Sequence, residues 1–197
     1  MKIIDARTTT SAGQVAAGQF FGVVALCLFW ANLSLAQYPG SWQALPDMPV
    51  GKWEPGTVVL DDKLYIFGGY TDGVVSSKRS EIFDPSDNSW TLIQELPSAI
   101  THMNMVLEGR TVWFAGGFKD GYRGHAIAEV WSYDVDLDRY TAAPLLPEPR
   151  AGGGLAVVDG KLHYFGGLMA DRDTDSSDHW VLDLEDWVQG SATWARA

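Results

Sequence analysis

The chain has 197 residues, of which 14 are Lys or Arg and 25 are Asp or Glu, so its formal net charge is −11. Hydrophobic residues make up 46% and aromatic residues 12%, which excludes a disordered or collagen-like chain, and an acidic charge without a basic cluster argues against nucleic-acid binding. A single cysteine, Cys27, excludes an internal disulfide and a zinc site built from several cysteines.

The first 36 residues have the pattern of a secretory signal peptide. Lys2 and Arg7 precede an uninterrupted apolar run of 12 residues at 20–31, and Ser34-Leu35-Ala36 supplies the small residues of a cleavage site. A bilayer-spanning helix needs about 20 apolar residues, so an uncleaved anchor over residues 15–36 is the alternative.

Cleavage is therefore expected between Ala36 and Gln37. It would release residues 37–197 as a secreted or periplasmic protein that meets a membrane only during export. Cys27 would be removed with the signal, so the exported chain contains no cysteine.

Residues 37–197 contain a motif that occurs three times. In each copy a short apolar run ends in a pair of glycines, and the pairs are 48 and 50 residues apart. A second apolar run precedes each of these, and two polar residues link the runs, which is typical of a β-hairpin with a tight turn. The glycine pairs are Gly68-Gly69, Gly116-Gly117 and Gly166-Gly167, and the links are Asp61-Asp62, Glu108-Gly109 and Asp159-Gly160.

Two further features recur with the same period. A third apolar run ends in an aspartate, and an aromatic residue follows it, so each unit predicts four strands. A lone aromatic residue near the amino end, Trp42, matches only the fourth strand of such a unit. The aspartates are Asp84, Asp134 and Asp183, and the aromatic residues are Trp90, Tyr140 and Trp194.

A period near 50 residues with four strands, a double glycine, an aspartate and an aromatic residue resembles the kelch repeat of β-propellers. The resemblance covers residues 42–194 and implies an all-β fold. It predicts three four-stranded blades at about 53–96, 101–146 and 151–197, and an isolated outer strand at about 40–44.

Closed propellers have about 4–8 blades, so three blades predict an incomplete ring. Two explanations are open. The chain is the amino-terminal portion of a longer protein that supplies the missing blades, or it is a short form that assembles with itself or with another chain.

Function in such a fold is expected in the loops at the propeller faces. The segments that enter each first strand hold Lys52, His102 and Arg150, and the resemblance implies that these positions point toward the central channel, where they would bind an anionic or hydroxylated ligand. Pairing of Arg150 with a nearby carboxylate or carbonyl is the alternative. The long, unlike loops after the glycine pairs add the candidate ligand-binding residues Arg123, His125 and His179.

The loop after the third glycine pair carries oxygen ligands at alternating positions, as calcium-binding loops do. Its residues are Asp171, Asp173, Asp175 and Asp178. The glycine and the distant glutamate of an EF-hand are absent, so a solvated acidic loop is the competing interpretation. No cofactor is expected, and His163 is expected to pack in the core, since Tyr65 and Trp113 occupy its position in the other units.

The resemblance favours an exported binding module that recognises a protein or a carbohydrate through its face loops. The alternative is an enzyme similar to sialic-acid mutarotases, with Arg150 and His102 near the channel; no catalytic set recurs in the loops. A copper radical oxidase resembling galactose oxidase needs a cysteine that the exported chain lacks. A ubiquitin-ligase adaptor is disfavoured by the signal peptide and by the missing partner domain.

Overall fold

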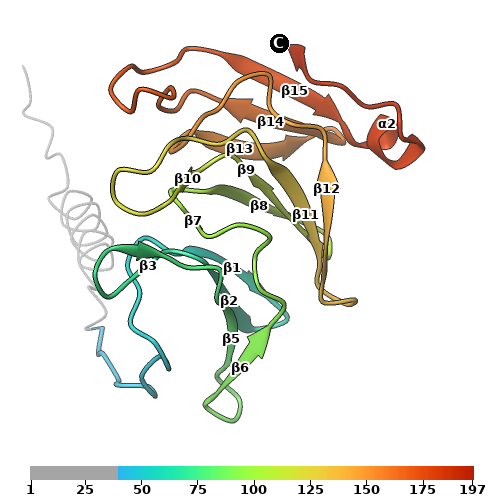
Figure 1. The fold of residues 1–197 in the computed structure, drawn as a ribbon. Coiled ribbons are helices and arrows are strands. Elements are labelled where there is room, and N and C mark those ends of the chain that lie inside the picture. Colours follow the sequence, from blue (N-terminus) through green and yellow to red (C-terminus); the bar gives the residue numbers. More distant parts are fainter. Residues whose placement is uncertain (1–39) are drawn as a thin grey trace, which may run out of the picture. The chain divides into compact units, whose positions relative to one another are not determined.

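The computed structural model describes residues 40–197 (Figure 1). The expected signal peptide, 1–36, and its cleavage site lie outside the described residues. Residues 45–197 form one compact unit that contains all the described strands. Within residues 40–197, no helix has the length and apolar character that crossing a bilayer requires.

The compact unit consists of three four-stranded antiparallel sheets, which confirms the all-β prediction. Each sheet is built from strands that follow one another along the chain. The first contains β1 (Gly56–Leu60), β2 (Lys63–Phe67), β5 (Ser80–Asp84) and β6 (Ser89–Ile93). The second contains β8 (Asn104–Glu108), β9 (Thr111–Ala115), β11 (Val130–Asp134) and β12 (Arg139–Ala143). The third contains β13 (Gly154–Val158), β14 (Lys161–Phe165), β15 (His179–Asp183) and β16 (Ala195–Arg196).

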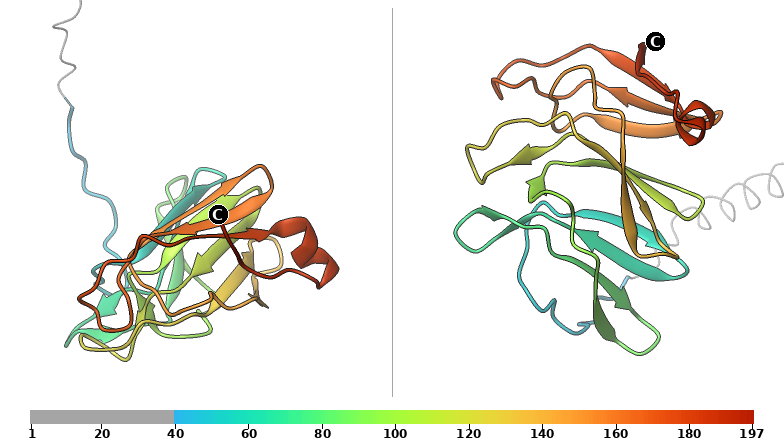
Figure 2. Two further views of the ribbon diagram at one scale, coloured as in Figure 1. Left: turned by 90° about the horizontal axis from the view of Figure 1, so that it is seen from above. Right: turned by 45° about the vertical axis from the view of Figure 1, so that its right-hand side comes forward.

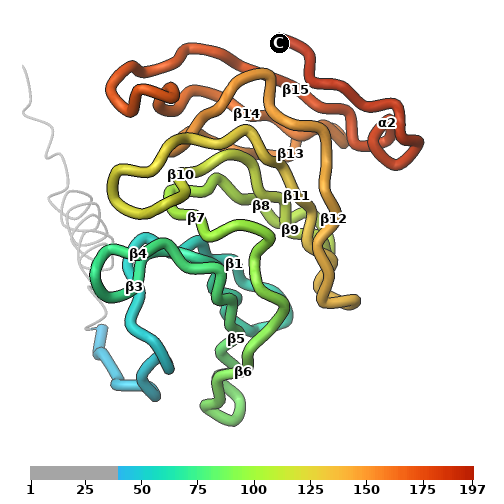
Figure 3. Tube along the Cα trace, in the orientation of Figure 1, coloured from blue at the N-terminus to red at the C-terminus, as the bar shows by residue number. Residues whose placement is uncertain are grey.

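Two small ribbons and one helix complete the unit. One ribbon pairs β3 (Tyr70–Thr71) with β4 (Val75–Ser76), and the other pairs β7 (Ile100–Thr101) with β10 (Phe118–Lys119). The helix, α2 (Leu184–Gln189), follows β15. The tube in Figure 3 shows how the chain leaves the last strand of one sheet and crosses to the first strand of the next.

Two-residue turns close the predicted hairpins. Asp61 and Asp62 have φ angles of 51° and 58°, and Asp159 and Gly160 have 49° and 71°, the left-handed values that a primed turn requires. In the second sheet Glu108 pairs with Thr111, so the turn residues are 109–110 and not the predicted Glu108-Gly109.

The recurring aspartate caps the turn after the third strand of each sheet. Oδ1 of Asp84 accepts a hydrogen bond from the backbone N–H of Ser86 at 2.9 Å, and Oδ1 of Asp134 accepts from Asp136 at 3.0 Å. Oδ1 of Asp183 likewise accepts from Glu185 at 3.0 Å and so caps α2. A short carboxylate satisfies the free N–H groups of the turn, which explains why the residue recurs.

The glycine pairs join each sheet to the next. The N–H of Gly69 donates to the carbonyl of Ile100 at 3.1 Å, and the N–H of Gly117 donates to the carbonyl of Arg150 at 2.9 Å. Both glycines have positive φ, and a Cβ on Gly117 would lie 2.9 Å from the carbonyl oxygen of Thr101. Only glycine allows this approach of two backbones without strain.

Side chains from facing sheets form two buried clusters. Tyr65 and Phe67 of the first sheet pack with Phe114 and Tyr133 of the second, and Trp113 of the second packs in the cluster of the third. The innermost strand β8 contacts both β1 and β13, so the first strands of the three sheets are neighbours. The right-hand view in Figure 2 shows the sheets following one another in chain order.

The third sheet departs from the repeat. The sequence predicts a fourth strand around Trp194, but α2 occupies part of this segment and β16 has only two residues, 195–196. The Trp194 side chain still makes the contact of the recurring aromatic residue: its Nε1 donates to the carbonyl of Pro144 at 2.8 Å, as Nε1 of Trp90 donates to the carbonyl of Pro46 at 3.2 Å.

The amino end also differs from expectation. Residues 40–44, where an outer strand is predicted, form no strand and are exposed, including Trp42. An outer strand needs a sheet edge to pair with, and none of the described sheets pairs with this segment. No strand of the first sheet pairs with the third, so within residues 40–197 the ring is not closed, as the blade count predicts.

Candidate functional site

Three loops gather at one end of the sheets, on the left in Figure 1. We call this surface the loop face; it comprises loops 70–79, 118–129 and 168–178 and entering segments 52–55, 100–103 and 150–153. The first residue after each glycine pair forms a bridge with the residue three positions before the first strand. These pairs are Tyr70 with Trp53, Phe118 with Thr101, and Leu168 with Ala151.

Direct contacts join neighbouring loops. The hydroxyl of Tyr70 donates to the carbonyl of Gly121 at 3.4 Å, and the N–H of Gly121 donates to Oγ of Ser76 at 3.1 Å. The Arg172 guanidinium lies 3.6 Å from the ring centroid of Phe118 and donates to the carbonyl of Gly124. The three loops therefore form one continuous surface that is organised before any partner binds.

Two aromatic side chains of the loop face are open to solvent. Trp53 is 43% exposed and packs on Tyr70 with ring centroids 4.5 Å apart, and Tyr122 is 65% exposed. Buried Tyr70 holds the Trp53 ring in place, so the indole presents one face without losing much freedom on binding.

His102 lies at the junction of the first two sheets. Its Nε2 is 3.2 Å from Oε2 of Glu54, and its Nδ1 is 3.1 Å from Oγ1 of Thr101. Glu54, His102 and Gly152 each lie two residues before a first strand and have φ angles of 54°, 49° and 63°. His102 is therefore equivalent to Glu54 and Gly152.

The sequence predicts one shared position for His102, Lys52 and Arg150, but His102 does not occupy the position of the other two. Lys52 and Arg150 lie 16 residues before the first glycine of their pair, and the residue at that distance in the second unit is Ile100. Counting back from the glycine pairs would have identified Ile100 as the equivalent of Lys52 and Arg150, and Glu54 as the equivalent of His102.

Lys52 is buried and paired. Its Nζ donates to the carbonyl of Arg79 at 2.6 Å and lies 3.1 Å from Oε2 of Glu81, which is also buried. Burial lowers the pKa of Lys52, and the hydrogen bond to Glu81 opposes this shift. The ammonium group therefore closes the end of the first sheet and does not face an open channel.

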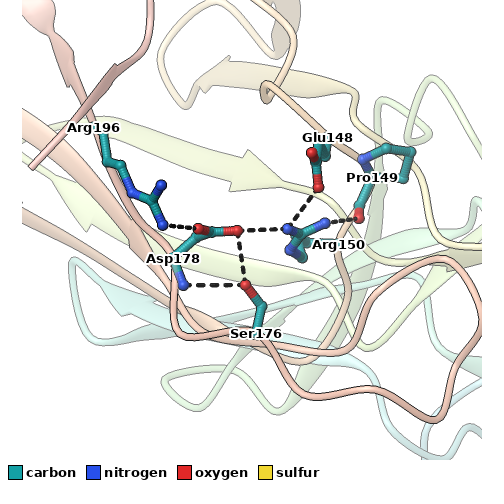
Figure 4. A network of polar contacts seen from close by, with 6 residues as sticks. All are labelled: Glu148, Pro149, Arg150, Ser176, Asp178 and Arg196. Atoms are coloured by element: carbon teal, nitrogen blue, oxygen red, sulfur yellow. Dashed lines mark hydrogen bonds and ion pairs between the residues drawn. The ribbon is translucent and has the colours of Figure 1, made fainter.

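Arg150 lies at the centre of a polar network, shown in Figure 4. Its Nη2 donates to Oε2 of Glu148 at 2.8 Å and to Oδ2 of Asp178 at 2.7 Å, and its Nη1 donates to the carbonyl of Pro149 at 2.9 Å. Arg196 donates to the other oxygen of Asp178 at 2.6 Å. Hydrogen bonds from Arg150 and then Ser176 lower the pKa of Asp178.

The Arg150 side chain is only 2% exposed, and its guanidinium stacks on Trp180 at 4.8 Å from the ring centroid. This geometry matches the alternative in which Arg150 pairs with nearby carboxylates and a carbonyl. Arg150 Nε has no hydrogen-bond partner within the described residues.

The three equivalent positions use different chemistry for the same structural task. Glu81, Trp131 and Trp180 each lie three residues before the recurring aspartate. Lys52 pairs with Glu81, Ile100 shares a buried cluster with Trp131, and Arg150 stacks on Trp180. Each sheet thus closes its end with a complementary pair.

The other candidate ligand residues do not converge. Arg123 is exposed, and Nδ1 of His125 lies 3.3 Å from Oδ2 of Asp120 within the same loop. Nε2 of His179 lies 2.9 Å from Nδ1 of His163 on the outer side of the third sheet. The expected core packing of His163 is therefore not seen, because no described sheet covers that side.

The acidic loop shows no calcium geometry. Asp171 accepts hydrogen bonds from the N–H groups of Asp173 and Thr174 and from the Thr174 hydroxyl, and the bonds from Thr174 lower its pKa to about 2. Asp178 is bound to Arg150 and Arg196. Across residues 40–197 no three His, Cys, Asp or Glu side chains gather as metal ligands. The predicted Asp171, Asp173, Asp175 and Asp178 set is thus not brought together.

A groove of about 370 Å³ lies where the linker after β6 meets β12, and Lys78 of loop 70–79 also lines it. The sequence does not predict this groove, because its lining comes from two units that only the fold brings together. The lining residues are Lys78, Gln94, Glu95, Leu96, Pro97, Arg139 and Tyr140.

The comparisons with known proteins agree on one family, the kelch-repeat proteins. The model of the KLHDC2/KLHL20/DRC7 Kelch-repeats domain matches residues 41–196. The chain is 27% identical over 151 residues to kelch repeat-containing protein At3g27220 of Arabidopsis thaliana, covering 74% of this chain and 34% of that protein. It is 25% identical over 140 residues to mouse Kelch-like protein 35, covering 71% of this chain and 23% of that protein.

Among solved structures, that of YjhT superposes with a TM-score of 0.61 at 15% identity, covering 78% of this chain and 53% of that chain. This likeness concerns the fold. The chain spans from about a quarter to a third of the length of the curated relatives it matches.

Proposed function

Because the chain belongs to the kelch-repeat propeller family, we propose that it is an exported interaction module that binds a protein partner through the loop face. The continuity of this surface carries the proposal. The loops of all three units are joined through Gly121, Gly124 and Arg172, and they present Trp53 and Tyr122 to solvent.

Trp and Tyr are the residue types that most often dominate the energy of protein interfaces. Some of the charged side chains around them are paired with one another, as Lys119 is with Glu129 at 3.3 Å. An aromatic centre within a polar rim suits a protein partner.

Export is supported by the sequence of residues 1–36 alone. If the proposal holds, the exported protein begins at Gln37, which sequencing of its amino terminus would reveal.

A carbohydrate is the second candidate ligand. A sugar ring can stack on an exposed indole such as Trp53, and Glu54 and His102 lie beside it as hydrogen-bonding groups. A mutarotase-like enzyme using Arg150 has less support, because the guanidinium is buried and bound to Glu148 and Asp178.

The test compares three forms of the 197-residue chain: wild type, W53A/Y122A, and L137A. Leu137 is an exposed apolar residue in the turn between β11 and β12, away from the loop face, and serves as the control. Each form is immobilised and offered extracellular and envelope proteins, and binding of each captured protein is then measured with purified material. A parallel glycan array reports on carbohydrate binding.

We expect a captured protein to bind wild type and L137A equally, and W53A/Y122A at least about tenfold more weakly. Equal binding to all three forms would contradict a role of the loop face. Binding of glycans alone, lost in W53A/Y122A, would instead assign the loop face to carbohydrate.

A further inference from the structure

The third sheet has one uncovered face. At the two joints within the chain, Tyr65 and Phe67 of β2 and Trp113 and Ala115 of β9 are buried by the following sheet. The matching residues of β14 are His163 and Phe165, and Phe165 is 47% exposed. This surface, formed by Ala156, His163, Phe165, His179 and Val181, is the trailing face.

The first sheet is partly uncovered on its opposite side, where Phe83 is buried but Val59 is exposed. Val59 of β1 and Leu92 of β6 are 64% and 59% exposed. The counterparts of Val59 in β8 and β13, Leu107 and Val157, pack into the buried clusters against the preceding sheet, whereas Ala142, the counterpart of Leu92 in β12, is exposed as Leu92 is. The register places Val59, Leu64, Phe83, Trp90 and Leu92 on this surface, the leading face.

The backbone at the two ends of the row of sheets has one donor and one acceptor without a hydrogen bond within residues 40–197. Gly69 and Gly117 each donate to the carbonyl four residues before the next first strand. The N–H of Gly167 makes no hydrogen bond within residues 40–197. The acceptor that the repeat assigns to it is the carbonyl of Lys52, which likewise accepts none there and belongs to a residue whose side chain is buried but whose backbone is not.

We propose that two copies of this chain close a six-sheet ring, in which the trailing face of each copy packs on the leading face of the other. Each joint would repeat the packing already present twice within the chain, with Phe165 entering the partner sheet and Gly167 donating to Lys52 of the other copy. A two-fold axis along the centre of the ring makes both joints identical and leaves neither face exposed.

The number of copies, two, is inferred by comparing the length of this chain with that of a solved propeller chain. The region that superposes on YjhT covers 53% of that chain, so two such regions amount to about one whole chain of that length. The inference is independent of the proposed function, because neither Trp53 nor Tyr122 belongs to the two faces.

The experiment is analytical ultracentrifugation of the 197-residue chain, as wild type, F165D, V59D and V188D. Val188 is exposed on α2, outside both faces, and is the control. We expect wild type and V188D to be dimers and F165D and V59D to be monomers. Association through residues 1–39 would be the same in all four forms of the chain, so it can be distinguished from association through the two faces.

Mixing F165D with V59D gives the decisive result. One joint in the mixed pair is then intact and the other carries both substitutions, so a heterodimer should form, at least about tenfold more weakly than the wild-type dimer because it has one joint. Each of three other results would overturn the proposal. A monomeric wild type would mean that another occupant covers the two faces. A dimeric V59D would mean that two trailing faces pack on each other, and open-ended oligomers would mean that the joints do not close a ring.

Discussion

At the scale of single residues, the glycine pairs between the first and second and between the second and third sheets are tightly constrained positions. Gly117 combines a φ angle of 124° with a backbone neighbour so close that a Cβ would lie 2.9 Å from the Thr101 carbonyl oxygen. Gly109, in the hairpin turn of the same sheet, also has a positive φ of 57°, but a Cβ there would meet nothing within 4 Å. The two glycines therefore differ in backbone conformation as well as in crowding.

We expect G109A to lower the free energy of unfolding by about 1–2 kcal/mol, the strain of a left-handed alanine. G117A should cost at least about 1 kcal/mol more, because the sheets must move apart to admit the methyl group. Urea unfolding followed by tryptophan fluorescence measures both. Equal losses would mean that the close approach of the two backbones at Gly117 is unimportant.

Much at this scale was predictable from the sequence. The glycine pairs, the capping aspartates and the outer aromatic residues each recur in phase, and a recurring backbone requirement leaves a recurring residue. Lys52, Ile100 and Arg150 could not be matched by residue type, because their shared task is to complement a partner side chain, and a complementary pair can be charged, apolar or stacked. Their equivalence is visible only by counting from the glycines.

At the scale of elements, the end of the first sheet contains a buried ion pair. Removing Lys52 alone leaves Glu81 buried with only Arg79 as its charged partner, whose Nε lies 2.5 Å from Oε1. The second sheet fills the same place with Ile100 and Trp131, so an apolar solution is compatible with this fold.

K52M should therefore destabilise the protein by up to about 3 kcal/mol, since the buried Glu81 carboxylate then keeps only the Arg79 guanidinium as a partner. The double variant K52M/E81L should recover most of the loss, because it removes both charges. Thermal and urea unfolding of the two single variants and the double variant form the cycle. A double variant as unstable as the sum of the single ones would show that the charges do not act as a pair.

The helix α2 is the element that the sequence analysis missed. The repeat assigns residues after Asp183 to an outer strand, yet Asp183 caps a helix by accepting from the N–H groups of Glu185 and Asp186. Trp187 of this helix packs edge-on against Trp113 with centroids 4.8 Å apart. The choice between strand and helix is thus decided by a tertiary contact from another sheet, which local periodicity does not report.

At the scale of the whole molecule, hydrogen-bonded carboxylates link folding to pH. The pKa of Asp84 falls to about 2 through hydrogen bonds from Lys63 and Ser86, and that of Asp171 falls to about 2 through Thr174. A carboxylate whose folded pKa is depressed stabilises the protein above its unfolded pKa of about 4, and this stability is lost as pH falls through the folded value.

The melting temperature should therefore fall between about pH 4 and pH 2, and less steeply in D171N than in wild type. D173N is the matched control, since the Asp173 carboxylate accepts no hydrogen bond within the described residues. Melting curves at half-unit pH steps provide the comparison. An acid branch of D171N that overlays that of wild type would refute the linkage.

The order of strands within each sheet bears on how the chain folds during its synthesis. Because β1, β2, β5 and β6 pair in the order in which they are translated, the first sheet can complete its backbone hydrogen bonds before the second has left the ribosome. The nascent chain then lacks a cover over the side of the first sheet that carries Tyr65 and Phe67, which β9 and β11 bury later. After each repeat is made, the growing chain therefore exposes one apolar side of its newest sheet, which is open to aggregation. This is always the side on which the next sheet will pack.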